Sequence, residues 1–384
     1  MDETAFSHWV QAQFPTLDSV LYLNHAAISP WPRAAADAAA AFAQENCEHG
    51  PLRGGQWLLR ENELRRACAR LLNADSGDDI ALLKNTSEGI CVVANGLDWR
   101  AGDNIVTPQA EFVTNQLPWD ALAASGVEVR RVAIRATEDP EAALIDALDA
   151  RTRVLTVSAV AWDDGFRLDL ERLGAACHES HALFFVDAIQ QLGALELDVR
   201  ACHVDALSAG AHKWLMGPEG MGVFYCSPAW RERLKLAQHG WRMLDEPYRF
   251  DRPDRSPSPT ARRFEAGSPN TLGQAVMLAS VKLLQELGIA EAQQRVLHNT
   301  DYLVAAISQM HGLRLASDTR PERRSGIVSI ELDGGGVTEL RRALARERIY
   351  VAERDGKLRI SPHWYQGPVE LERLLALLRS RTNN

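Results

Sequence analysis

The stretch Leu183-Phe184-Phe185-Val186-Asp187-Ala188-Ile189-Gln190 contains an uninterrupted apolar run that ends in a carboxylate. Short, continuous apolar runs are typical of strands that are buried on both faces of a parallel sheet. The sequence has six further runs of this kind, at residues 80–83, 104–106, 127–134, 154–160, 204–207 and 222–225. Helix-like stretches such as 140–148 and 168–180 lie between them. This alternation predicts an α/β fold with a mostly parallel, seven-stranded sheet.

The bulk composition narrows the class of protein. The chain has 384 residues, of which 46% are hydrophobic and 24% charged, as in ordinary globular proteins. A net charge of -9 repels phosphate backbones and argues against nucleic-acid binding. No apolar run approaches the roughly 18 residues of a membrane helix, and the acidic start Met1-Asp2-Glu3-Thr4 lacks the features of a signal peptide. We therefore expect a cytoplasmic protein with neither nucleic acid nor membrane as a partner.

The second half of the chain predicts a smaller domain. Residues 245–263 hold four prolines and many charges, which indicates a surface excursion near a domain edge. Beyond it we expect a long helix at 271–287, a final helix at 369–379, and strands at 326–330, 349–351 and 358–360. These elements predict a large domain at residues 20–265 and a small α+β domain built from residues 1–19 and 266–384.

A lysine stands out in Ser208-Ala209-Gly210-Ala211-His212-Lys213-Trp214-Leu215, where small residues surround it after an apolar strand. A partly buried amine has a lowered pKa and can attack a carbonyl; a surface lysine in a loop is the alternative. Asp187 lies 26 residues earlier, about one strand-helix-strand crossover. Both side chains are therefore expected at the carboxyl ends of neighbouring strands, where α/β sheets bind ligands.

Pyridoxal 5'-phosphate (PLP) needs this pair of residues. The lysine forms a Schiff base, and the aspartate keeps a proton on the pyridine nitrogen so that the ring accepts electrons. A buried structural Asp187 is the alternative. A third element, Asn85-Thr86-Ser87-Glu88-Gly89, lies between a strand and a helix. Hydroxyls and N–H groups at a helix N-terminus bind phosphate, although an ordinary helix cap gives the same pattern.

Other cofactors find little support. The first strand is not followed by G-x-G-x-x-G, and G-x-x-x-x-G-K-[ST] does not occur, which argues against a nicotinamide oxidoreductase. His203 with Asp205, and His178 with His181, are pairs that bind metals in other proteins, but neither has a third ligand nearby. We therefore expect no metal site.

Together these motifs resemble the class V aminotransferase family of fold-type I PLP enzymes, which includes cysteine desulfurases, kynureninase and isopenicillin-N-epimerase-like proteins. The resemblance covers nearly the whole chain, with motifs at residues 22–27, 85–90, 186–190, 212–215, 263–270 and 358–363. The lysine motif and Arg263-Phe264-Glu265-Ala266-Gly267-Ser268-Pro269-Asn270 are the most specific. The resemblance implies PLP as the cofactor, an amino-acid substrate, and a homodimer with shared active sites.

The resemblance also implies roles for individual residues. Lys213 would carry the cofactor and move the Cα proton, while Asp187 would pair with the ring nitrogen. The expected cofactor contacts are completed by Gln190 at the phenolic oxygen, by Phe112 stacked on the ring, and by Thr86, Ser87, His212 and the partner's Ser268 at the phosphate. Arg359 would clamp the substrate α-carboxylate, which suits a planar guanidinium, and Asn24 and His25 would lie near the substrate.

Some of these assignments have alternatives. The alternatives are that Phe112 is a core residue, that Arg359 is a surface residue and that His25 is a packing residue. Trp162 departs from the family pattern, because desulfurases place an asparagine near the cofactor oxygen there. Trp241 and Arg242 resemble a substrate-side segment of some relatives and are left unassigned.

The cysteines bear on the reaction. Desulfurases of this family carry a nucleophilic cysteine shortly before the clamp arginine, but 350–357 contains none and Cys226 is the last of six cysteines. A persulfide mechanism needs a thiolate. We therefore expect amino-group transfer first, a C–S or C–C lyase second and an amino-acid epimerase third. A cysteine desulfurase or a non-catalytic module of this fold ranks below them, and the presence of Lys213, Asp187 and Arg359 argues against the module.

Overall fold

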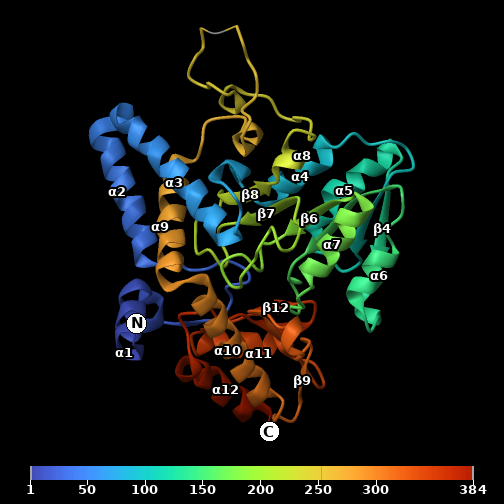
Figure 1. Ribbon diagram of the computed structural model, residues 1–384. Helices are drawn as coiled ribbons and strands as arrows, with labels where there is room; N and C mark the ends of the chain where they lie inside the picture. Colours follow the sequence, from blue (N-terminus) through green and yellow to red (C-terminus); the bar gives the residue numbers. More distant parts are fainter. Residues whose placement is uncertain (1, 252, 383–384) are drawn as a thin grey trace.

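A seven-stranded sheet lies at the centre of the protein (Figure 1), in a computed structural model that describes residues 2–251 and 253–382. The strand order is β2-β8-β7-β6-β5-β3-β4, and only β8 runs antiparallel to its neighbours. The strands are β2 (Ile80–Leu83), β3 (Asn104–Pro108), β4 (Glu128–Val132), β5 (Thr152–Ser158), β6 (Leu183–Asp187), β7 (Ala206–Gly210) and β8 (Gly222–Cys226). The predicted α/β class with a mostly parallel, seven-stranded sheet is confirmed.

Strand β6 shows why residues 183–186 of this central strand are apolar at every position. Successive side chains of a strand point to opposite faces, and in β6 both faces are covered. Leu183 and Phe185 pack with α4 (Thr86–Gly96), α5 (Leu117–Asp120) and α8 (Pro228–Arg231). Phe184 and Val186 pack in the other cluster, with α3 (Gly54–Leu72), α6 (Pro140–Asp146), α7 (Leu170–Ser180) and α9 (Thr271–Leu287).

A four-stranded antiparallel sheet of order β12-β13-β10-β9 forms the lower part of Figure 1. Its strands are β9 (Leu313–Leu315), β10 (Val328–Leu332), β12 (Ala352–Arg354) and β13 (Lys357–Ile360). Helices α10 (Ile289–Ile307), α11 (Val337–Arg346) and α12 (Pro368–Thr382) share an apolar cluster with it. The chain enters this region early, because β1 (Leu21–Tyr22) pairs in parallel with β11 (Ile349–Tyr350).

The predicted boundary at residues 265 and 266 stays a prediction. Helix α9, which the sequence assigned to the small domain, packs against α2 (Arg33–His49) and α3 on the left of Figure 1. Helix α1 (Glu3–Gln13) lies below them near the N-terminus. Within the described ranges, no helix combines the length and apolarity that crossing a membrane requires.

Candidate active site

Asp187 and Lys213 line one cavity of about 330 Å³, at the carboxyl ends of the central strands. Asp187 is the last residue of β6, and Lys213 follows β7, the next strand in the sheet. The cavity brings together the predicted residues Thr86, Ser87, Phe112, Asp187, Gln190, His212, Lys213 and Arg359. Asn24, His25 and Ser268 are not among its lining residues.

The two charged groups at its base shift each other's pKa. Burial lowers the pKa of the Lys213 amine to about 8, against the attraction of Asp187, and Arg359 and Arg354 lower it further. Burial raises the pKa of Asp187 to about 6, although the Ile189 N–H and the Lys213 charge act in the opposite direction. An amine with a pKa of about 8 has a far larger neutral, nucleophilic fraction near neutral pH than an ordinary lysine. Because Lys213 is not exposed and lines this cavity, the alternative of a surface lysine is wrong.

The N-terminus of α4 forms one wall of the cavity. Asn85 caps the helix by accepting a hydrogen bond from the Glu88 N–H at 2.9 Å. The Thr86 hydroxyl oxygen accepts from the Gly210 N–H at 3.0 Å, which ties the helix start to the end of β7. Close packing of helix on sheet requires Gly89, since a Cβ there would lie 2.4 Å from Ser208 Oγ. Thr86 and Ser87 are thus held at the positively polarised end of a helix, which suits a phosphate.

Phe112 lies at the mouth of the cavity with 40% of its surface exposed. Its ring centroid is 5.9 Å from the Lys213 amine and 5.6 Å from the Trp162 ring. The alternative of a core phenylalanine is therefore wrong. Trp162, whose role the sequence left open, lines the cavity beside it.

Arg359, on β13 of the four-stranded sheet, also lines the cavity. It is only 2% exposed, so the alternative of a surface arginine is wrong. Its guanidinium donates to the Trp162 carbonyl at 2.5 Å and to Asn24 Oδ1 at 3.5 Å, while its Nε has no partner. Burial and the nearby Arg354 charge lower its pKa to about 10. A buried cation with an unpartnered N–H fits an anionic ligand.

Gln190 and His25 are engaged within the protein. The Gln190 amide donates to the Ala26 carbonyl at 3.0 Å and accepts from the Trp214 indole at 3.0 Å. His25 is fully buried, with one ring nitrogen 2.8 Å from the Ser361 carbonyl and the other 2.7 Å from the Tyr365 hydroxyl. Burial lowers its pKa to about 4. The structure thus places His25 in the packing around the site rather than in the cavity.

Ser268 does not line the Lys213 cavity. It is exposed and lines a second cavity of about 600 Å³ together with Lys84, Asn85 and Asn270, of which Asn85 also lines the Lys213 cavity. Its predicted contact with a phosphate bound in the partner subunit remains a prediction.

Arg354 is a lining residue that the sequence reasoning missed. It ends β12, and a tight turn at Asp355 and Gly356, both with positive φ, reverses the chain into β13. The Asp-Gly pair is a recognised hairpin signal. That signal would have placed Arg354 on the strand beside Arg359.

The cavity fits PLP. The neutralisable amine of Lys213 suits an aldehyde, the buried carboxyl of Asp187 suits a protonated ring nitrogen, and the start of α4 suits a phosphate. The unpartnered Nε of Arg359 leaves a place for the carboxylate of an amino acid. His212 lies beside Lys213, and burial together with the Lys213 charge lowers its pKa.

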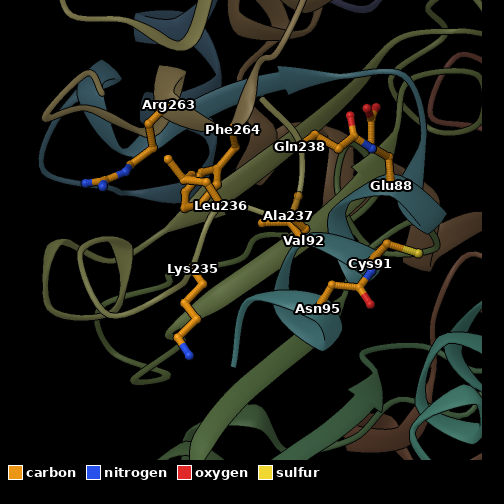
Figure 2. Close-up of a pocket in the computed structure, with 10 residues that line it drawn as sticks. All are labelled: Glu88, Cys91, Val92, Asn95, Lys235, Leu236, Ala237, Gln238, Arg263 and Phe264. Carbon is orange, nitrogen blue, oxygen red and sulfur yellow. The ribbon is translucent and has the colours of Figure 1, made fainter. Parts of the chain in front are cut away.

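Cysteines are placed elsewhere. None of the six is among the described residues that line the Lys213 cavity. Figure 2 shows Cys91 in a different pocket, between α4 and residues 235–238, which shares no lining residue with the Lys213 cavity. Burial and the Glu88 charge raise the pKa of Cys91, which keeps its thiol protonated at neutral pH.

Comparisons with known proteins show which family the chain resembles. Residues 21–361 match the family described as Aminotransferase class-V. A protein named "probable cysteine desulfurase" from Methanothermobacter thermautotrophicus is 31% identical over 393 residues, which cover 95% of each chain. A cysteine desulfurase of Escherichia coli K12 is 28% identical over 84% of this chain and 82% of its own.

Solved structures extend the likeness. A cystine C–S lyase, C-DES, in complex with its product cysteine persulfide has 26% identity and a TM-score of 0.89, covering 96% of this chain and 99% of its own. A C-DES variant with glycine covalently linked to the PLP cofactor superimposes with the same TM-score of 0.89 and covers 98% of its own chain. An apo cysteine desulfurase from Thermococcus onnurineus, 22% identical with a TM-score of 0.86 and 98% coverage of both chains, supports the fold. These findings confirm the expected fold type and cofactor.

Proposed function

The chain belongs to the class V aminotransferase family, and from that premise we propose that it is a C–S lyase that acts by β-elimination on a sulfur-containing α-amino acid. It is a PLP-dependent enzyme. PLP, when bound, supplies the electron sink that stabilises negative charge at the substrate Cα.

One observation carries the choice of reaction. The cavity that holds Lys213 and Arg359 contains no cysteine among its described lining residues. A desulfurase must transfer sulfur to an enzyme thiolate. Without such a thiolate, the sulfur has to leave in a small-molecule product. The likeness to a probable cysteine desulfurase and to a cystine C–S lyase favours chemistry at a C–S bond over the amino-group transfer that the sequence ranked first.

The side chains of this chain then have distinct tasks. Arg359 binds the α-carboxylate, Lys213 holds the cofactor and removes the Cα proton, and Asp187 holds a proton at the ring nitrogen. Thr86, Ser87 and His212 bind the phosphate, and Phe112 covers the mouth of the cavity. Loss of the Cα proton and departure of sulfur from Cβ leave an enamine, which water converts to pyruvate and ammonia.

Arg354 points to the kind of sulfur compound. The cavity already has one arginine for the α-carboxylate, and Arg354 supplies a second guanidinium on the neighbouring strand. L-Cystine carries a second carboxylate and L-cysteine does not. We therefore favour a disulfide amino acid as substrate: cystine and water give pyruvate, ammonia and cysteine persulfide, in which all atoms balance.

The oligomeric state belongs to the same proposal. We propose a homodimer in which Ser268 contacts the phosphate bound in the partner subunit, as the family resemblance implies. Exposed Ser268, in its own cavity, is compatible with such a contact. A cytoplasmic location stays a prediction from the sequence.

Product analysis tests the proposal. Holoenzyme incubated with L-cystine is expected to release pyruvate, ammonia and cysteine persulfide in equal amounts, and Lys213→Ala is expected to release none. Alanine as the product would instead indicate desulfuration. A 2-oxo acid that retains the sulfur, formed only with an added amino acceptor, would indicate amino-group transfer. Either result overturns the assignment as a lyase.

A further inference from the structure

Glu111 is a buried carboxyl that the proposed reaction does not use. It lies between β3 and Phe112 and is 6% exposed. One carboxyl oxygen accepts from the Ser158 N–H at 2.6 Å, and the other from the Ser158 hydroxyl at 2.5 Å. The side chain therefore holds the end of β5, because Ser158 is the last residue of that strand.

Ser158 connects Glu111 to the active site. It pairs directly with Asp187 in the parallel register of β5 and β6, and the Ala159 N–H donates to the Asp187 carbonyl at 2.9 Å. Glu111 is thus linked to Asp187 through Ser158, and it lines a small separate pocket with Ser158 rather than the Lys213 cavity. Its neighbour Phe112 reaches that cavity.

We propose that Glu111 is a positioning residue that fixes the end of β5 beside Asp187 and, when ionised, reinforces the negative charge at the ring-nitrogen end of the cofactor site. This inference rests on the proposed pairing of Asp187 with PLP. A second negative charge near Asp187 stabilises the protonated ring nitrogen, which is the proposed partner of Asp187. It therefore favours bound PLP over free PLP.

The charges around Glu111 allow it to titrate in the working range. Burial and the Asp187 charge raise its pKa to about 7, although the Ser158 hydrogen bonds and Asn115 lower it. Arg135 lines the same small pocket as Glu111 and pairs with Asp164 at 2.7 Å. Lys213 faces Asp187 from the cavity. Glu111 therefore gains its charge as the pH rises through about 7.

The test compares wild type with Glu111→Gln, which keeps an acceptor for the Ser158 N–H and offers the Ser158 hydroxyl oxygen an N–H donor in place of the carboxylate acceptor. The affinity for PLP is measured from pH 5.5 to 9 by titrating the dialysed protein with the cofactor. As the pH rises through about 7, the affinity of wild type for PLP is expected to increase several-fold relative to the affinity of Glu111→Gln. Glu138→Gln, which removes an exposed carboxylate, controls for loss of a charge and is expected to follow wild type.

A second variant tests the charge without removing it. Ser158→Ala loses a hydrogen bond that lowers the pKa of Glu111, so the step in PLP affinity is expected to move to higher pH. The proposal is overturned if Glu111→Gln has the same pH profile as wild type, or if Ser158→Ala leaves the step in place. Wild type that takes up no PLP at any pH would instead overturn the proposed function itself.

Discussion

Asp187 and Lys213 face the same cavity from neighbouring strands, and each shifts the pKa of the other against the effect of burial. Burial alone would favour the neutral form of both groups. Their mutual attraction limits this effect, so that the amine loses its proton near pH 8 and the carboxyl near pH 6. Between these values both groups are charged, and above about pH 8 the pair combines a neutral, nucleophilic amine with an ionised carboxylate.

The first prediction concerns the pH dependence of cofactor uptake. The neutral Lys213 amine is the nucleophile, so the rate of PLP binding to cofactor-free protein is expected to rise about tenfold per pH unit below pH 8 and to level off above it. Stopped-flow absorbance measures this rate. Asp187→Asn removes the charge that raises the pKa of Lys213 and is expected to move the profile to lower pH. A rate that does not vary between pH 6 and 9 would contradict the assignment.

Asp187→Asn is also expected to separate binding from turnover. The asparagine keeps the shape of the side chain but cannot hold a proton on the ring nitrogen. We expect PLP to remain bound and kcat to fall by about 10²-fold or more, as for other losses of transition-state charge stabilisation. Steady-state pyruvate formation and the absorbance of the bound cofactor report the two properties. Asp37→Asn, on the exposed side of α2, is the control, and equal kcat values in both variants would remove Asp187 from the site.

Arg359→Lys tests recognition of the α-carboxylate. Lysine keeps the charge but not the planar fork of donors. Loss of a buried, hydrogen-bonded charge contact costs about 2 kcal/mol or more, so kcat/KM is expected to fall about 30-fold, mainly through KM. Initial rates over a range of L-cystine concentrations give both constants. Arg342→Lys on the exposed side of α11 should behave as wild type, and an unchanged KM in Arg359→Lys would argue against the clamp.

A buried ion network supports the segment that carries Ser268. Arg65 on α3 donates to both oxygens of Glu265, at 2.6 and 2.8 Å, and also to Glu61 at 2.6 Å. Without Glu265, the buried guanidiniums of Arg65 and Arg242 share the single carboxylate of Glu61. One buried positive charge is then uncompensated, so Glu265→Ala is expected to lower the free energy of unfolding by about 3–5 kcal/mol. Urea denaturation measures the change.

The matched control removes a carboxylate from the same helix, α3. Glu63 pairs with Lys282 at 2.6 Å, but both side chains are about half exposed. Glu63→Ala is expected to cost less than about 1 kcal/mol. Equal losses in the two variants would show that burial of the network has no energetic effect.

The sequence predicted correctly the helices and strands whose residue pattern is contained in one short stretch of the chain. The apolar run at 183–186 became β6 because both of its faces are buried, and the helix predicted at 271–287 matches α9. The order of Thr86, Asp187 and Lys213 along the chain was enough to place them at one sheet edge, because parallel strands bring their carboxyl ends together.

Features that depend on tertiary contacts were missed. β9 and β12 are three residues long and carry charged side chains, so neither has a recognisable apolar run, and Arg354 was overlooked with β12. The surroundings of His25 are set by Ser361 and Tyr365, more than 300 positions away in the chain. No local pattern could show that both of its ring nitrogens are engaged.

The shared active site of the proposed homodimer can be tested by mixing two inactive variants. Lys213→Ala removes the nucleophile, and Ser268→Asp places a negative charge against the phosphate that Ser268 is proposed to contact. If Ser268 serves the partner's site, a mixed dimer has one site with both changes and one site with neither. Random exchange of subunits is then expected to restore about a quarter of wild-type activity, because half of the dimers are mixed and each has one intact site. If Ser268 serves the site of its own chain, each site of the mixed dimer keeps one defect and activity stays absent. Sedimentation of wild type as a monomer with normal PLP content would contradict the dimer altogether.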